Sequence, residues 1–181
     1  YFPAPHKERM VKLVQNLQTA LRERIQAQDW MSDSTKNVAI DKLNTFHTKI
    51  GYPDKWRSYE HLSVSLDKSL WENMMNININ EFNYFVEKHY NKPVDPDEWF
   101  MTPQTINAYY NPTTNEICFP AGILQYPFFD MEADDAFNYG AIGVVIGHEM
   151  THGFDDEGRK FDKDGNMHEW WAQGDAEKFD A

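Results

Sequence analysis

Apolar side chains in the first half of the chain recur at steps of three and four residues, which is the spacing of one face of an amphipathic helix. This pattern predicts helices over residues 6–27, 34–50 and 66–90. Gly51 and Pro53, which are typical stop signals, follow the second helix. Asparagines in the middle of the third helix lower its helix propensity and leave room for a break. The apolar positions that carry the pattern are Met10, Val14, Leu17, Leu21, Ile25, Val38, Leu43, Phe46, Ile50, Leu66, Leu70, Met74, Ile77, Phe82 and Phe85.

A different pattern begins after Trp99. Residues 105–110 and 116–119 have the composition of strands, and the polar loop between them predicts a β-hairpin. Residues 136–154 return to a helical pattern, and a turn at 162–166 precedes an amphipathic tail. The chain is therefore predicted to be mainly α with a small antiparallel β element.

Prolines at positions 93 and 96 mark a boundary between the two halves. We expect a helical segment over residues 1–98, which carries no recognisable chemistry, and a second segment over residues 99–181. The first residues have neither an initiator Met nor the layout of a signal peptide, and the last ones fall within a predicted helix. The chain is therefore expected to be part of a larger protein.

The acidic balance and the single cysteine narrow the class of protein. A formal charge of −12 argues against a nucleic-acid or anionic-membrane surface, since both recruit Lys and Arg. No stretch reaches the roughly 18–20 apolar residues of a membrane span. Cys118 is the only cysteine, so an internal disulfide is excluded, and we expect it to act as a small buried hydrophobe. One cysteine fits either a reducing compartment or a bacterial envelope protein that has no disulfides.

The chemistry of the chain lies in the predicted helix over residues 136–154. His148 and His152 are four residues apart, so both imidazoles project from one face, about one turn from each other. Two neutral imidazoles in this geometry can hold Zn²⁺ at about 2.0–2.1 Å. Glu149 can take a proton from water whose pKa the ion lowers to about 7, and can then deliver it to a leaving amine. This motif predicts a zinc-dependent hydrolase, with a chance match on an ordinary helix as the alternative.

Acidic residues crowd the end of this helix, where negative charge is unfavourable. Asp155 lies three residues after His152, and it either orients a ligand imidazole or belongs to a solvated acidic turn. A calcium loop at 162–166 is not expected, because its glycine falls at the wrong position and no glutamate closes the run correctly.

Longer motifs surround the two histidines. Residues 145–156 read Val-Ile-Gly-His-Glu-Met-Thr-His-Gly-Phe-Asp-Asp, and further motifs lie at 30–31, 49–53, 107–110, 119–125, 164–166 and 170–171. These motifs resemble the neprilysin and endothelin-converting-enzyme family of zinc metallopeptidases, here as a bacterial-type member. The resemblance extends over nearly the whole chain and favours a zinc site over a chance motif.

The resemblance implies a gluzincin-like catalytic portion preceded by a helical segment. Residues 1–98 would be part of the family's helical cap domain, and residues 99–181 would be the N-terminal part of the catalytic domain, without the third zinc ligand. The family further implies an endopeptidase that cleaves peptides on the amino side of hydrophobic residues. By position, His148 and His152 are its zinc ligands and Glu149 is its general base.

The family also implies contacts with the substrate. Asn107 and Ala108 would form hydrogen bonds with the peptide backbone from an edge strand, which is a form of β-augmentation. The pocket for the residue after the scissile bond would be lined by Ile123, Phe128, Val144 and Val145.

The sequence departs from this family at the third zinc ligand, which is a glutamate in a motif several dozen residues beyond the histidines. Glu157, Glu169 and Glu177 match by residue type only, and Gly158 stands where a metzincin needs its third histidine. The expected function is therefore that of a zinc endopeptidase in an incomplete, inactive portion that needs its missing C-terminal part. The alternative is a non-catalytic peptide- or zinc-binding module. The low cysteine count favours a bacterial member, because animal members of this family are rich in disulfides. An extracytoplasmic location, secreted or in a bacterial envelope, is expected over a cytoplasmic one.

Overall fold

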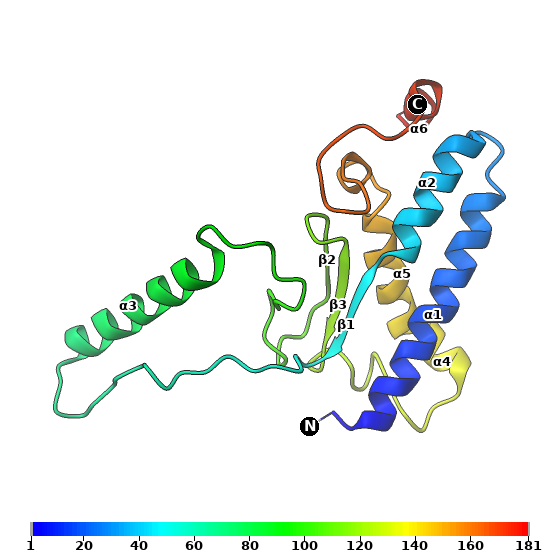
Figure 1. The fold of residues 1–181 in the computed structure, drawn as a ribbon. Helices are drawn as coiled ribbons and strands as arrows, with labels where there is room; N and C mark the ends of the chain where they lie inside the picture. Colours follow the sequence, from blue (N-terminus) through cyan, green and yellow to red (C-terminus); the bar gives the residue numbers. More distant parts are fainter. Residues whose placement is uncertain (1, 181) are drawn as a thin grey trace. The chain divides into compact units, whose positions relative to one another are not determined.

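The computed structural model describes residues 2–180, which form two compact units (Figure 1). The first unit joins the chain up to Pro53 with the part from Trp99 onward, and the second spans Asp54–Glu98. The assignment of residues 1–98 and 99–181 to two domains of a larger enzyme stays a prediction.

Two helices open the first unit and lie side by side (Figure 1). Helix α1 (Ala4–Gln26) begins with a proline in its first turn, where the missing N–H costs no hydrogen bond. Helix α2 (Asp33–Asn44) begins after Ser32, whose hydroxyl accepts the N–H of Thr35. Val38, expected to face inward, is 37% exposed, because Thr35, Ala39, Lys42 and Leu43 form the buried face of α2 instead.

The prediction that the second helix continues to residue 50 is wrong. The chain leaves the helix after Asn44 and forms strand β1 (His47–Gly51). This strand pairs in parallel with β3 (Glu116–Pro120), and the buried Lys49 ammonium lies 2.6 Å from the buried Glu116 carboxylate. A pairing partner almost seventy residues away overrides the local helical pattern.

The predicted hairpin is present, with two changes. Strand β2 (Tyr109–Asn111) pairs antiparallel with β3, and the strand order is β1-β3-β2, so the sheet is mixed rather than purely antiparallel. The predicted strand over residues 105–110 begins only at Tyr109, because the preceding segment turns closely over Gly122. A Cβ at Gly122 would lie 2.5 Å from the carbonyl oxygen of Gln104, so this approach requires glycine.

The predicted single helix over residues 136–154 is two helices, α4 (Asp135–Gly140) and α5 (Ile142–His152). The break falls at Ala141, whose backbone leaves the helical region, with φ −105° and ψ −91°. The N–H of Ile142 donates to the carbonyl of Phe128 at 2.8 Å. The loop before α4 therefore fixes the point at which α5 begins.

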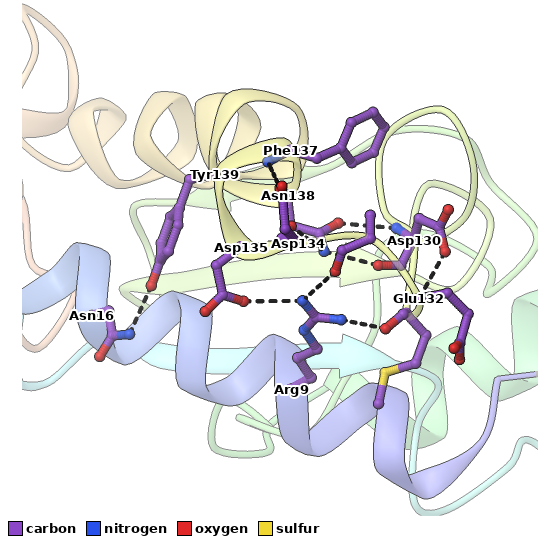
Figure 2. Close-up of polar contacts among 11 residues, drawn as sticks. Arg9, Asn16, Asp130, Glu132, Asp134, Asp135, Phe137, Asn138 and Tyr139 are labelled. Atoms are coloured by element: carbon purple, nitrogen blue, oxygen red, sulfur yellow. Dashed lines mark hydrogen bonds and ion pairs between the residues drawn. The ribbon is translucent and has the colours of Figure 1, made fainter.

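Helix α1 anchors α4 and the loop before it through polar side chains (Figure 2). The Arg9 guanidinium donates to the carbonyls of Met131 and Ala133 and to the Asp135 carboxylate. Further along α1, the Asn16 amide donates to the Tyr139 hydroxyl at 2.7 Å. These contacts fix the approach to α5 from a helix more than 100 residues earlier in the chain.

The tail of the first unit folds back onto its helices. A short 3-10 helix, η1 (Gly158–Lys160), follows α5, and helix α6 (Gln173–Phe179) ends the described chain. Between them is the predicted turn at 162–166, followed by Trp171, which stacks on Trp30 with 5.9 Å between ring centroids. Cys118 has no exposed surface, which confirms its expected place in the core.

The second unit is built around helix α3 (Leu70–His89). The helix starts with a capping box between Ser69 and Glu72 and runs without the break that its asparagines left room for. Two asparagine side chains of α3 donate to backbone carbonyls outside the helix, Asn73 to Ser65 and Asn76 to Ser63. Within residues 2–180, no helix is both long and apolar enough to cross a membrane.

Candidate metal centre

The two motif histidines converge at the C-terminal end of α5. The Nε2 atoms of His148 and His152 are 2.9 Å apart, and their ring centroids are 4.4 Å apart. Neither ring is buried, so solvent and ligands can reach both nitrogens. Two imidazole nitrogens directed to one point from one side of a helix are a donor pair that suits Zn²⁺.

Asp155 holds His152 from the far side of its ring. Its carboxylate lies 2.6 Å from His152 Nδ1 and accepts the N–H groups of Glu157 and Gly158 at 3.1 and 2.7 Å. Burial opposes the charge, but these hydrogen bonds outweigh it and lower the pKa of Asp155. An ionised carboxylate at Nδ1 favours the tautomer that protonates this atom and leaves the Nε2 lone pair for a metal.

Glu149 is buried beside the two histidines, with 6% of its surface exposed. Burial raises the pKa of its carboxyl group, and the nearby imidazoles and the backbone N–H of Tyr110 oppose this rise. Tyr110 belongs to β2, so the edge strand touches the functional helix at this glutamate. This backbone contact cannot be read from the sequence, because any residue at position 110 other than proline offers the same N–H.

The two residues expected to bind peptide backbone lie immediately before β2. Asn107 is exposed and Ala108 is buried, and neither belongs to the strand itself. The strand that follows, β2, lies at the edge of the described sheet, as the family resemblance implies. Helix α5 contacts β2, so this free edge lies near the histidines.

The four candidate pocket residues come from two segments. Val144 and Val145 lie in the first turn of α5. Phe128 is held beside this turn because its carbonyl accepts the N–H of Ile142. Ile123 lies in the core, 6% exposed, whereas Val144 is 65% exposed. A separate apolar cavity of about 430 Å³ involves none of these four residues and lies between the ends of α1, α2, α5 and α6.

Comparison with known proteins decides the family. The sequence profile described as "Peptidase family M13" matches residues 107–181, and a second profile of the same description matches residues 1–53. Together these matches cover more than half of the chain, including the α5 motif. The chain belongs to peptidase family M13.

Curated relatives of this M13 chain include animal and bacterial proteins. Neprilysin-11 of Caenorhabditis elegans is 40% identical over 99% of the chain, which corresponds to 22% of that relative. The neutral endopeptidase of Lactobacillus helveticus is 39% identical over 99% of the chain and 28% of its own length. The chain therefore spans about a quarter of the length of the relatives that it matches.

Solved structures agree with the fold of the M13 chain. The zinc metalloprotease Zmp1 of Mycobacterium tuberculosis, in complex with an inhibitor, is 52% identical with a TM-score of 0.91, over 97% of this chain and 26% of that one. PepO of Lactobacillus rhamnosis is 36% identical with a TM-score of 0.93, over 99% and 29%. These similarities support the mainly helical class with a small sheet.

A complete catalytic zinc site has three protein ligands. Within residues 2–180, no three His, Cys, Asp or Glu side chains gather where they could share a metal ion. Glu157 instead binds Lys160, and Glu169 lies 3.8 Å from Arg159. The two histidines and Asp155 fit a zinc site that takes a further ligand from elsewhere.

Proposed function

We propose that these residues form part of the active site of a zinc-dependent endopeptidase, with His148 and His152 as two of its zinc ligands. The observation that carries this proposal is the convergence of the two Nε2 atoms at 2.9 Å, with Asp155 bound behind His152. The M13 family membership supports it, since an M13 relative of known structure is named a zinc metalloprotease.

Glu149 is the general base of the proposed reaction. Bound zinc supplies Lewis-acid activation, which brings the pKa of a coordinated water down to about 7. The Glu149 carboxylate would take the proton from the attacking water and pass it to the amine that leaves when the peptide bond breaks. Burial raises the pKa of this carboxyl group, which makes it a stronger base than an exposed glutamate.

The substrate of the proposed enzyme is a peptide in extended conformation. The free edge of β2 lies beside Glu149, and the exposed Asn107 precedes it, so a peptide could add to this edge and bond with Asn107 and Ala108. Ile123, Phe128, Val144 and Val145 would form an apolar pocket for the residue after the scissile bond. Cleavage is therefore proposed on the amino side of hydrophobic residues.

The remaining parts of the proposal concern the whole protein. The third zinc ligand and the rest of the site would come from a C-terminal part of the same enzyme, in keeping with the quarter of its relatives' length that this chain spans. We place the enzyme outside the cytoplasm, secreted or in a bacterial envelope. Its single cysteine forms no internal disulfide, which is compatible with a bacterial envelope protein. No nucleic-acid partner is proposed, because the net charge is −12.

The zinc assignment is tested by metal analysis of the full-length protein. His148→Ala and His152→Ala should each reduce bound zinc below one equivalent, because each removes a ligand. Glu149→Gln should retain the zinc and lower kcat at least about 10²-fold, because it removes the base and not a ligand. Undiminished zinc in both histidine variants would refute the metal site, and full zinc with no turnover in the wild-type protein would indicate a non-catalytic binding module.

A further inference from the structure

We propose that Lys42, a buried lysine of α2, is a positioning residue for the metal-binding imidazole of His152. Lys42 touches neither histidine, and it acts through the loop that carries Asp155. The inference rests on the proposed zinc site. It adds Lys42, which lies on another helix, to the residues that hold the His152 imidazole in position.

Lys42 is enclosed and its charge is fully used. The residue has no exposed surface, although lysine is among the residues least often buried. Its ammonium group donates to three backbone carbonyls, those of Gly153, Gly158 and Phe161, each at 2.7 Å. Three donors meet three acceptors, so the protonated form is satisfied completely.

Aromatic rings complete the enclosure of this ammonium group. The rings of Tyr110, Phe154 and Trp170 lie with their centroids 5.9, 5.7 and 5.7 Å from Nζ. Burial lowers the pKa of Lys42 to about 8, against the opposing charges of Asp162 and Asp155. The group is therefore still a cation at neutral pH, and its site resembles the aromatic cages that hold ammonium ligands.

The three carbonyls surround the segment that holds His152. Gly153 directly follows α5, and Gly158 and Phe161 lie on the return of the loop, so one cation ties both ends of the loop around Asp155 together. The Gly158 peptide is the direct link. Its carbonyl accepts from Lys42, and its N–H donates to the Asp155 carboxylate at 2.7 Å, which in turn binds His152 Nδ1.

Electrostatics explains why a cation stands at this place. The C-terminus of a helix carries a partial negative charge, and the acidic residues 155–157 add to it immediately after α5. Unpaired carbonyls in the last turn need donors. Lys42 supplies both a positive charge and donors, which offsets the repulsion that would otherwise push the Asp155 loop away from α5.

Gly158 shows how tightly this loop is held. A Cβ at Gly158 would lie 1.7 Å from the carbonyl oxygen of His152, so the loop returns directly against the end of α5. A loop in such close contact leaves the Asp155 carboxylate little freedom relative to the imidazole. Lys42 closes the loop in this position from the side of α2.

The first test is a spectroscopic one on the metal-free full-length protein. The Nδ1 proton of His152, hydrogen-bonded to Asp155, should give a downfield proton resonance that is absent from Asp155→Asn. Lys42→Met keeps the length of the side chain and removes the charge, and it should broaden or shift this resonance while the protein remains folded by circular dichroism. An unchanged resonance in folded Lys42→Met would overturn the inference, whatever the protein's affinity for zinc.

The second test is a double-mutant cycle on the zinc dissociation constant. Loss of a carboxylate behind a metal-binding histidine typically weakens metal binding about 10–100-fold, and we expect this of Asp155→Asn. Lys42→Met should weaken binding about 10-fold by itself and cause no further loss in the Asp155→Asn background. Additive effects would show that Lys42 stabilises the core without acting through Asp155, and would contradict the inference.

Two further variants keep the tests decisive. Lys160→Met is the matched control, because this lysine lies on the same loop but pairs with Glu157 and is 44% exposed, so both readouts should stay unchanged. If Lys42→Met does not fold, Lys42→Arg repeats both measurements. Arginine keeps the charge, but its planar guanidinium cannot replace the compact ammonium at three carbonyls 2.7 Å away. An intermediate effect on both readouts therefore supports the inference, and an effect on neither readout contradicts it. If His152→Ala binds zinc as tightly as the wild type does, the proposed metal site is refuted. The His152 resonance of the metal-free protein would still test the role of Lys42.

Discussion

The role proposed for Asn107 in peptide binding depends on its side-chain amide. It is exposed immediately before the edge strand, and its amide offers both a donor and an acceptor. Ala108, its neighbour, is buried and offers a peptide only its backbone. A substrate that added to β2 would therefore meet one specific amide at the end of a row of backbone groups.

We predict that Asn107→Ala raises KM for peptide substrates roughly 3–10-fold, the equivalent of one neutral hydrogen bond of about 0.5–1.5 kcal/mol. The zinc content should not change, because no ligand is touched. Steady-state kinetics and metal analysis of the full-length enzyme provide the measurement. Asn37→Ala, which removes an exposed amide on α2, is the control, and an Asn107→Ala enzyme with wild-type KM would remove this residue from the substrate site.

Helix α6 is attached to the start of α2 through a buried carboxylate. The Asp175 carboxylate, in a residue only 3% exposed, accepts hydrogen bonds from the N–H and hydroxyl of Ser32 and from the hydroxyl of Thr35 at the start of α2. Hydrogen bonds from Ser32 and Thr35 lower the pKa of Asp175 to about 2 from its usual 3.8. The Asp175 carboxylate therefore links α6, the last helix of the described chain, to the start of helix α2.

The pH dependence of this anchor follows from the lowered pKa. The folded state binds the Asp175 proton more weakly than the unfolded state, so its contribution to stability is complete above pH 3.8 and is lost as the pH falls toward 2. We predict that Asp175→Asn lowers the melting temperature at pH 7 by on the order of 3–8 °C.

Between pH 4 and pH 2, the melting temperature of Asp175→Asn should fall less than that of the wild type. Thermal melts followed by circular dichroism at a series of pH values test this expectation. Glu177→Gln on the exposed side of α6 is the control, because it should melt as the wild type does. Parallel pH profiles for the wild type and Asp175→Asn would show that this carboxylate is not the source of the acid sensitivity.

At the scale of the whole molecule, two features indicate that the described residues interact with further protein. Within residues 2–180, only His148 and His152 are proposed as zinc ligands and no three donor side chains gather, whereas a catalytic zinc site needs about three protein ligands. In the second unit, α3 has no buried residue and exposes Leu70, Trp71, Phe82 and Phe85. Exposed apolar side chains in such number mark an interaction surface.

We predict that the 181 residues by themselves hydrolyse no peptide at an enzymatic rate. Zinc affinity should be weak with two ligands, because each preorganised ligand adds binding free energy, and the exposed face of α3 should favour self-association. The measurement is a quenched fluorescent peptide assay with added zinc, with light scattering for association. Turnover that Glu149→Gln abolishes would show that the chain holds a complete site with an unrecognised third ligand.

The sequence by itself determined what depends on neighbouring residues. The three- and four-residue apolar spacing predicted α1 and α3 within a few residues, and the strand composition predicted the β2–β3 hairpin. The spacing of His148 and His152 placed both imidazoles on one face, because helix geometry alone decides this. The motifs around them indicated the neprilysin and endothelin-converting-enzyme family, and the M13 profile matches confirm it.

Only the tertiary structure decided what depends on partners distant in the chain. Residues 47–50 carry a helical pattern yet belong to strand β1, because they pair with β3. The break at Ala141 follows from the bond between Ile142 and Phe128, and the burial of Lys42 follows from three carbonyls more than 100 residues later. A local pattern indicates which face of a segment is apolar, but it does not indicate which distant group will pack against that face. Contacts of this kind therefore depend on the tertiary structure.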